Sequence, residues 1–202
     1  MKSTTASVCQ TLIAITIWPL PAAFEKDKRM DKLILDACCG GRAFWFDKNN
    51  PLTLFVDRRT MQPEAVGNGI NSRIRKCLPD EESDFRKMSY SSESFKLVVF
   101  DPPHLFCGEK SFMNKCYGSL DKNTWKNDLK QGFSECFRVL KDDGILIFKW
   151  NESEIPLKNI LRLAKYKPLF GHPSGRAQKT HWVTFMKNPA SCRDIKEVVV
   201  EN

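Results

Sequence analysis

Short apolar segments that each end in an aspartate constrain the fold of this chain more than any other feature. Residues 32–36, 51–57 and 95–101 follow this pattern. A short apolar run that contains β-branched residues is typical of a buried strand. Open α/β sheets bind their ligands at the carboxyl ends of such strands. The terminal aspartates are therefore expected along one edge of a sheet, next to a ligand.

Helix-like and strand-like patterns alternate along the rest of the chain. Residues 125–140 place apolar side chains at helical spacing, which predicts a helix with one face in the core. Apolar runs at 145–150 and 181–186 predict further strands, and 157–165 predicts another helix. This alternation favours a parallel sheet wrapped by helices.

The segment Asp101-Pro102-Pro103-His104 directly follows the apolar run 95–100. Two consecutive prolines fix φ and remove two backbone donors, so the turn is stiff and its carbonyls remain free to accept hydrogen bonds. A carboxylate and a carbonyl side by side suit the hydrogens of a planar amino group. The alternative is that these residues only end a strand and start a turn.

A second motif, Asp36-Ala37-Cys38-Cys39-Gly40-Gly41-Arg42, follows the run that begins at Lys32. Glycines after a strand allow a sharp turn and a close approach of the backbone to a ligand. Asp57 follows at about the 20-residue spacing at which nucleotide-binding βαβ units place an acid on ribose hydroxyls. A turn-capping role is the alternative for Asp57.

In this order, the acid and glycine loop, the second acid and the Asp-Pro-Pro-His turn resemble class I S-adenosylmethionine-dependent methyltransferases. The Asp-Pro-Pro-His turn is similar to that of the amino-methyltransferases, including small bacterial and phage DNA N6-adenine methyltransferases. The likeness spans roughly residues 30–187. It implies an α/β, Rossmann-like class I methyltransferase fold, with a mostly parallel sheet, helices on both faces and an antiparallel last strand.

The resemblance also implies roles for individual residues. The catalytic turn would be Asp101, Pro102, Pro103 and His104. The cofactor S-adenosyl-L-methionine (SAM) would be held by Asp36, Cys38, Gly40, Gly41, Asp57, Asp84 and Phe85, the last two at the adenine. No metal site is predicted. Arg42 stands where the family has a glycine, and would either pair with the cofactor carboxylate or lie on the surface. His104 replaces the more frequent Tyr, Phe or Trp.

The implied function is transfer of a methyl group to an exocyclic amine of a nucleic-acid base, with adenine in DNA as the first choice. The alternatives are an RNA base (adenine or guanine), a protein amide, or a catalytically silent methyltransferase-like subunit that only binds nucleic acid. Residues 105–124 and 171–180 combine cations with aromatic residues or glycines, so these stretches are expected to form loops that contact the substrate.

Composition sets the remaining expectations. The net charge of +8 in 202 residues favours a polyanionic partner. Eight cysteines without a Cys-x-x-Cys pair suit a reducing cytoplasm rather than a zinc site. Residues 30–190 are expected to form the methyltransferase domain, with a tail at 191–202. Residues 1–29 form an extension whose weakly signal-like run, 12–18, is too short to cross a membrane. The oligomeric state stays open.

Overall fold

The computed structural model describes residues 31–66 and 72–187. The expectations for residues 1–29 and for the tail at 191–202 lie outside the described residues. Among the described residues, no helix combines the length and the apolar composition that a bilayer crossing requires.

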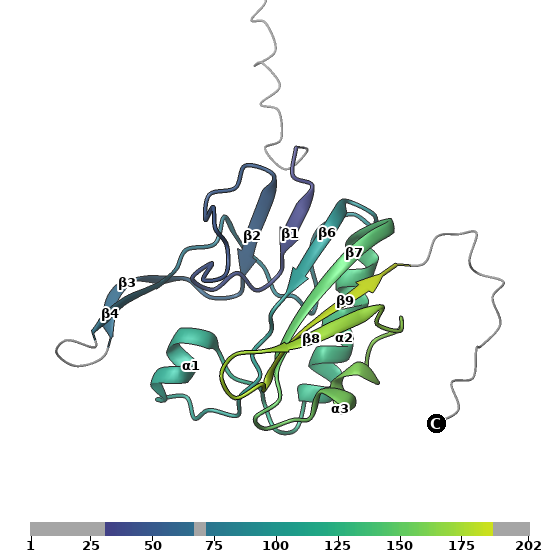
Figure 1. Cartoon of the computed structure of the whole chain (residues 1–202). Coiled ribbons are helices and arrows are strands. Elements are labelled where there is room, and N and C mark those ends of the chain that lie inside the picture. Colours follow the sequence, from purple (N-terminus) through teal and green to yellow (C-terminus); the bar gives the residue numbers. More distant parts are fainter. Residues whose placement is uncertain (1–30, 67–71, 188–202) are drawn as a thin grey trace, which may run out of the picture. The chain divides into compact units, whose positions relative to one another are not determined.

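The centre of the fold is a seven-stranded sheet (Figure 1). Its strands run in the spatial order β5 (Glu81–Glu82), β2 (Thr53–Asp57), β1 (Ile34–Asp36), β6 (Phe95–Phe100), β7 (Leu140–Asn151), β9 (Thr180–Met186) and β8 (Phe170–Ser174). The first five are parallel, β9 is antiparallel to β7, and β8 is antiparallel to β9. The predicted mostly parallel sheet with an antiparallel last strand is confirmed.

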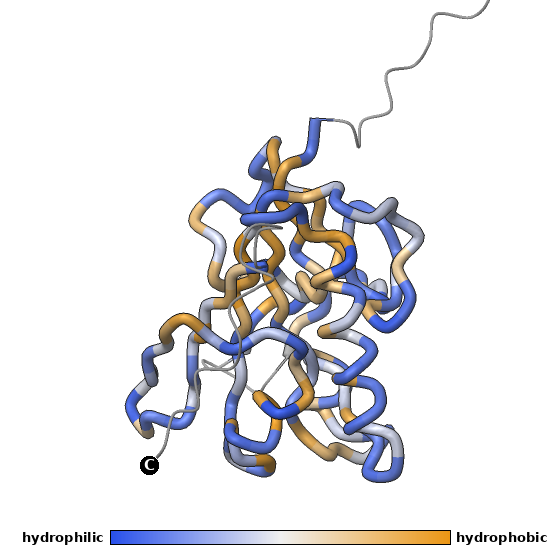
Figure 2. Tube along the Cα trace, turned by 90° about the vertical axis from the view of Figure 1, so that its right-hand side faces the viewer, coloured by the Kyte–Doolittle hydropathy of each residue, from blue (hydrophilic) through white to orange (hydrophobic). Residues whose placement is uncertain are grey.

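Two helices cover one face of this sheet. Helix α2 (Trp125–Val139) matches the prediction for residues 125–140, while α3 (Leu157–Leu161) is shorter than predicted. Phe133 and Phe137 of α2 lie 6.0 and 5.9 Å from the ring of Phe185, and Phe137 lies 4.6 Å from Tyr166, just after α3. Burying each such side chain contributes about 1.5–3 kcal/mol, so this packing anchors the sheet. In Figure 2 the apolar stretches of the strands gather inside and hydrophilic stretches follow the outer turns.

The opposite face is covered differently. Between β1 and β2 the chain forms turns rather than a helix, and Trp45 packs edge-on against Phe55 at 5.0 Å. Gly40, Gly41 and the turn residues before Pro51 disfavour a helix there. Between β2 and β5 the chain forms an antiparallel pair, β3 (Met61–Val66) and β4 (Arg73–Cys77). In the described part of the chain, therefore, no helix connects β1 to β2 or β2 to β5.

Both predicted loops contain regular structure. Residues 105–124 include the short helix α1 (Phe112–Tyr117). The prediction of a loop over 171–180 is wrong at its start, because Phe170–Ser174 form strand β8. Pro173 is tolerated there because β8 is an edge strand, where a missing N–H need not break a ladder.

Candidate active site

A cavity of about 280 Å³ lies at the carboxyl ends of the central strands. It brings together most of the site residues predicted from the sequence, namely Cys38, Gly40, Gly41, Asp57, Phe85, Asp101, Pro102, Pro103 and His104. Asp36 and Asp84 do not line it. The lower end of the range for small-molecule sites is about 300 Å³, so the cavity is narrow for a nucleoside ligand.

Asp36 lies behind the cavity and supports its wall. The side chain is fully buried, and it accepts hydrogen bonds from Trp45 Nε1 at 2.7 Å and from the N–H of Cys38 at 3.3 Å. Burial raises the pKa of Asp36 to about 7, since these two neutral donors only partly offset the loss of solvation. The carboxyl therefore braces the glycine loop from inside.

Arg42 holds the glycine loop in an unusual backbone conformation. Its φ is +54°, in the left-handed region that glycine adopts more easily. The guanidinium donates to Lys48 O and Leu78 O at 2.6 and 2.9 Å, and packs 3.9 Å from the ring centre of Phe55. It also pairs with Asp80 at 2.8 Å. Arg42 thus occupies a left-handed position at the end of the loop, and its side chain ties the loop to its surroundings.

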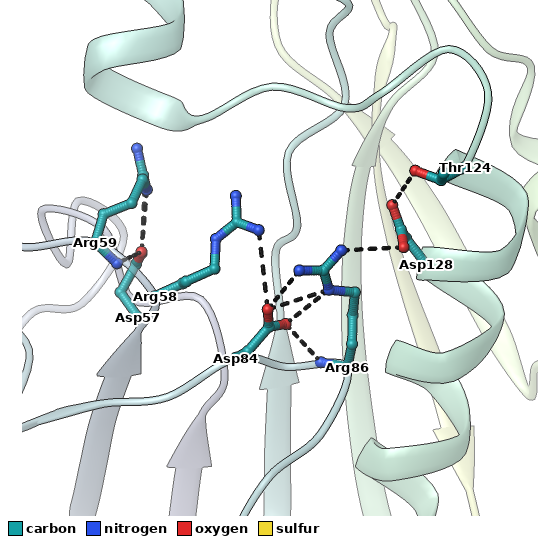
Figure 3. A network of polar contacts seen from close by, with 7 residues as sticks. All are labelled: Asp57, Arg58, Arg59, Asp84, Arg86, Thr124 and Asp128. Carbon is teal, nitrogen blue, oxygen red and sulfur yellow. Dashed lines mark hydrogen bonds and ion pairs between the residues drawn. The ribbon is translucent and has the colours of Figure 1, made fainter.

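Asp57 lines the cavity, but Arg59 closes its carboxylate (Figure 3). Oδ1 accepts from the N–H and from Nε of Arg59 at 3.0 and 3.1 Å, and Oδ2 accepts from Nη2 at 3.2 Å. The N–H of Gly40 donates to Oδ2 at 3.0 Å. A carboxylate has about four acceptor positions, so this one is filled. A sugar hydroxyl can bind here only if Arg59 moves aside.

Asp84 belongs to a separate polar network (Figure 3). Arg86 pairs with it at 2.6 Å and reaches Asp128 of α2 at 3.1 Å, while Arg58 approaches Asp84 at 3.8 Å. Burial alone would raise the pKa of Asp84, but the hydrogen bonds from Arg86 hold it below its usual range. Phe85 does line the cavity and packs 5.3 Å from Phe100. Of the two residues predicted to hold the adenine, Asp84 and Phe85, only Phe85 lines the cavity.

Asp101 stands on the other side of the cavity with one oxygen open. Lys149 Nζ donates to Oδ2 at 2.6 Å. Among residues 31–66 and 72–187, nothing donates to Oδ1 or to the carbonyl of Pro102. Burial raises the pKa of Asp101 above its ordinary value, although the ammonium of Lys149 opposes the shift. Asp101 Oδ1 and the carbonyl of Pro102, one residue apart in the sequence, are therefore two acceptors without a donor in the described part of the chain.

Lys149 lines the cavity but belongs to none of the sequence motifs that predicted the site. It lies in β7, and its ammonium is 5.6 and 5.8 Å from the ring centres of Phe44 and Trp182. The sequence signal was a lone cation inside the apolar run 145–150, because a lysine in a buried strand needs a partner. That partner is Asp101, on the neighbouring strand end.

His104 and Gly118 complete the turn. The His104 ring lies 6.1 Å from Trp150, and burial lowers the pKa of His104, so the imidazole is neutral near pH 7. A Cβ on Gly118, the residue that ends α1, would come within 3.0 Å of Pro103. Glycine thus lets the chain after α1 pack directly on the Pro-Pro turn.

Comparison with known proteins shows the fold. No protein-family model and no curated protein sequence matches this chain. A crystal structure of the PH0226 protein from Pyrococcus horikoshii is similar over 77% of this chain and 81% of that one, with 15% identity and a TM-score of 0.50. At this identity the match bears on the fold alone, and with the strand order it supports the Rossmann-like architecture predicted from the sequence.

Two further structures share the arrangement more loosely. One is a TehB-like SAM-dependent methyltransferase from Corynebacterium glutamicum, at 14% identity over 78% of this chain and 81% of that one. The other is a SAM-dependent methyltransferase from Methanosarcina mazei, at 12% identity over 79% and 94%. Both TM-scores are 0.46, too low to support a conclusion about this chain.

Proposed function

We propose that the protein is a SAM-dependent N-methyltransferase that acts on an exocyclic amine of a nucleic-acid base, adenine in DNA before all others. One observation carries the proposal. Asp101 and Pro102, whose Oδ1 and carbonyl have no donor among the described residues, line the same cavity as the glycine loop and Asp57. An acceptor pair for an amine and the loop of a nucleoside cofactor thus share one small space.

The types of residue around the cavity suit the chemical groups of SAM. Gly40 has a φ of +46° and open space where a Cβ would be, so its backbone leaves room for a ligand. Asp57 offers a carboxylate for the ribose hydroxyls once Arg59 is displaced, and Phe85 offers a ring for the adenine. When bound, SAM supplies a methyl group that the positive charge of its sulfonium already activates.

The protein's own contribution is mostly positioning. Asp101 Oδ1 and Pro102 O would each accept one hydrogen of the target amine, which draws the nitrogen lone pair out of conjugation with the base. Lys149 fixes Asp101 and favours its ionised form, since its ammonium opposes the upward pKa shift that burial causes. The amine proton leaves after the new C–N bond has made the nitrogen cationic, so a strong general base is not required.

The target base has to leave its stack to reach this cavity, at a cost of a few kcal/mol in a duplex. The neutral ring of His104 lies next to the acceptor pair and offers a face for the base. A neutral ring also avoids a second positive charge near Lys149. These properties support a flat, uncharged heterocycle at this place.

A second candidate is a catalytically silent subunit that binds nucleic acid without SAM. The closed carboxylate of Asp57 favours it, because Arg59 fills the acceptor positions that a ribose needs. Arg42 at the family's glycine position points the same way.

Calorimetric titration of SAM, followed by a transfer assay, separates the two candidates. We expect saturable SAM binding, and radiolabelled methyl transfer to DNA in a panel of DNA, RNA and protein. The Asp101→Asn variant is the matched control, since it keeps the size of the side chain and should still bind SAM. Absence of SAM binding in the wild-type protein supports the silent subunit, and label only on RNA or protein reassigns the substrate.

A further inference from the structure

A second, larger hollow lies beside the candidate active site. Its volume is about 490 Å³, and it separates the base of the β3–β4 pair from helix α1. Its lining consists of Arg59, Thr60, Met61, Glu109, Lys110, Ser111, Phe112, Asn114 and Lys115. We call this hollow the hairpin groove. The methyl-transfer reaction proposed for the cavity does not require the hairpin groove.

Direct contacts hold the two walls of the hairpin groove together. Lys115 of α1 pairs with Glu64 of β3 at 2.5 Å, and the guanidinium of Arg75 in β4 lies 5.8 Å from the ring centre of Tyr117. Figure 1 shows the β3–β4 pair extending from the sheet next to α1. One wall of the groove therefore comes from the β3–β4 pair and the other from α1, and direct contacts fix the two walls relative to each other.

The walls combine positive charge with exposed rings. In the lining, three cations, Lys110, Lys115 and Arg59, stand against one carboxylate, Glu109. Two of these cations also have a carboxylate partner outside the lining, Glu64 for Lys115 and Asp57 for Arg59, which leaves Lys110 as the cation most available to a phosphate. Phe112, in the lining, is 46% exposed, and Tyr117, at the other end of the same short helix, is 43% exposed, so aromatic rings are available for stacking at this place. Cations that follow a phosphate backbone and aromatic rings that stack on bases are the two elements of single-strand binding surfaces.

Arg59 connects the groove to the active-site cavity. It lines both hollows. Its Nη1 is buried and has no hydrogen-bond partner among the described residues, although Nε and Nη2 bind Asp57. Figure 3 shows the side chain extending from Asp57 toward α1. A buried guanidinium nitrogen without an acceptor costs free energy, and an anionic oxygen at this junction would satisfy it.

We propose that the hairpin groove binds the sugar-phosphate backbone of a single nucleic-acid strand next to the target base, with a phosphate at Arg59. This inference rests on the proposed function, which requires an unstacked base in the adjoining cavity. A base can enter that cavity only if its neighbours on the strand lie close to the cavity mouth. The groove starts there and carries the charge and the rings that such a strand needs.

The test is fluorescence anisotropy with a short labelled single strand of DNA, without SAM, at several salt concentrations. We expect Lys110→Ala/Lys115→Ala to weaken binding about tenfold and to reduce the salt slope by about 1.4, since each lost phosphate contact removes about 0.7 on a single strand. Phe112→Ala should weaken binding about fivefold or more through lost stacking.

Lys96→Ala/Lys130→Ala is the matched control, because it removes the same charge from exposed positions on β6 and α2, outside the groove lining. It should bind the strand like the wild type. Thermal denaturation shows whether each variant is folded, and Lys110→Gln/Lys115→Gln replaces the alanine double variant of the groove if that variant has a lowered midpoint.

The outcomes separate this inference from the proposed function. Equal binding by groove and control variants overturns the groove, while methyl transfer to DNA would still stand. Loss of binding in the groove variants supports the groove even if no methyl transfer is found. Tighter binding of an RNA strand supports the groove and changes the nucleic acid. Binding of duplex only, or of neither strand, overturns it.

Discussion

Asp57 and Asp101 both end a parallel strand and both pair with a cation, yet their carboxylates differ in what they can still accept. Arg59 and Gly40 occupy every acceptor position of Asp57. Lys149 occupies only Oδ2 of Asp101. The Asp57 side of the cavity, which we propose for the cofactor, is thus closed, whereas the Asp101 side, which we propose for the reaction, is open to one more donor.

The origin of each cation explains the difference. Arg59 lies two positions after Asp57 in the same chain segment, so it can rotate away without disturbing the sheet. Lys149 lies on β7, whose pairing with β6 is fixed by the register that places Phe148 opposite Phe100. Two aromatic rings also flank its ammonium. The first ion pair can open for a ligand, while the second is a permanent part of the site.

Asp101→Ala is expected to have the largest effect. Removing the open acceptor should lower the rate of methyl transfer about a hundred- to a thousandfold, by analogy with the loss of one preorganised transition-state hydrogen bond. SAM affinity should change less than about threefold, or 0.7 kcal/mol. Initial rates at saturating SAM, with calorimetry on the same sample, measure both. A rate within about tenfold of the wild type, or 1.4 kcal/mol, contradicts the assignment.

Asp36 extends the comparison to a strand-end acid without a cation. Because burial raises its pKa from the ordinary 3.8 to about 7, the folded state holds the proton more tightly, and the wild type loses stability as pH rises toward 7. Between pH 5 and pH 8 this amounts to about 2.6 kcal/mol, most of which is lost by pH 7. Above about pH 8 the carboxyl is ionised in both states, and this contribution is constant.

Asp36→Asn carries no such proton, so its melting temperature relative to the wild type should rise by roughly 5–10 °C from pH 5 to pH 8. Differential scanning calorimetry of both proteins at the two pH values measures this. A constant difference in melting temperature would show that the Asp36 carboxyl titrates normally, and that Trp45 and Cys38 solvate it better than its burial implies.

Asp57→Ala should weaken SAM binding by about 1.5–3 kcal/mol, or one to two decades, because a charge-assisted hydrogen bond to ribose is lost. The rate at saturating SAM should fall much less than in Asp101→Ala. Calorimetric titration is the measurement. Unchanged affinity would place the ribose contact at another residue.

Arg59→Met removes the competing cation and keeps a side chain of similar length. SAM binding should become about tenfold tighter, or 1.4 kcal/mol, since the ribose no longer has to displace an ion pair. Arg59→Lys is the control, because it keeps the charge but loses the fork that grips the carboxylate. Weaker SAM binding in Arg59→Met would mean that Arg59 holds the cofactor instead of competing with it.

The parts predicted correctly are those that local sequence determines. An apolar run followed by an acid identifies a strand end, so Asp57 and Asp101 could be placed at one edge before the fold was known. The β3–β4 pair was missed because β4 mixes cations with a single exposed isoleucine, Ile74, which gives no apolar face. Strand β8 was missed because Gly171, His172 and Pro173 have low strand propensity, and only pairing with β9 orders them.

The contacts of the charged side chains could not be predicted in the same way. Nothing in the sequence decides that Arg59 turns back onto Asp57, or that Asp84 is bound by Arg86 instead of facing the cavity. These choices depend on which partners the fold brings within reach. Lys149 is an intermediate case. A lysine in an apolar strand needs a charged partner, but the sequence does not show that this partner is Asp101.

The central claim, that an exocyclic base amine is methylated beside Asp101, is tested most directly by mass spectrometry of nucleosides after reaction with SAM carrying a deuterated methyl group. Two single-stranded DNA substrates would be compared, identical except that every adenine in one is replaced by purine, which lacks the 6-amino group. The account predicts deuterated N6-methyladenine from the first strand, no label on the second, and loss of label in Asp101→Ala. Equal labelling of the strand that lacks adenine, at an atom other than the exocyclic amines of cytosine and guanine, would contradict it.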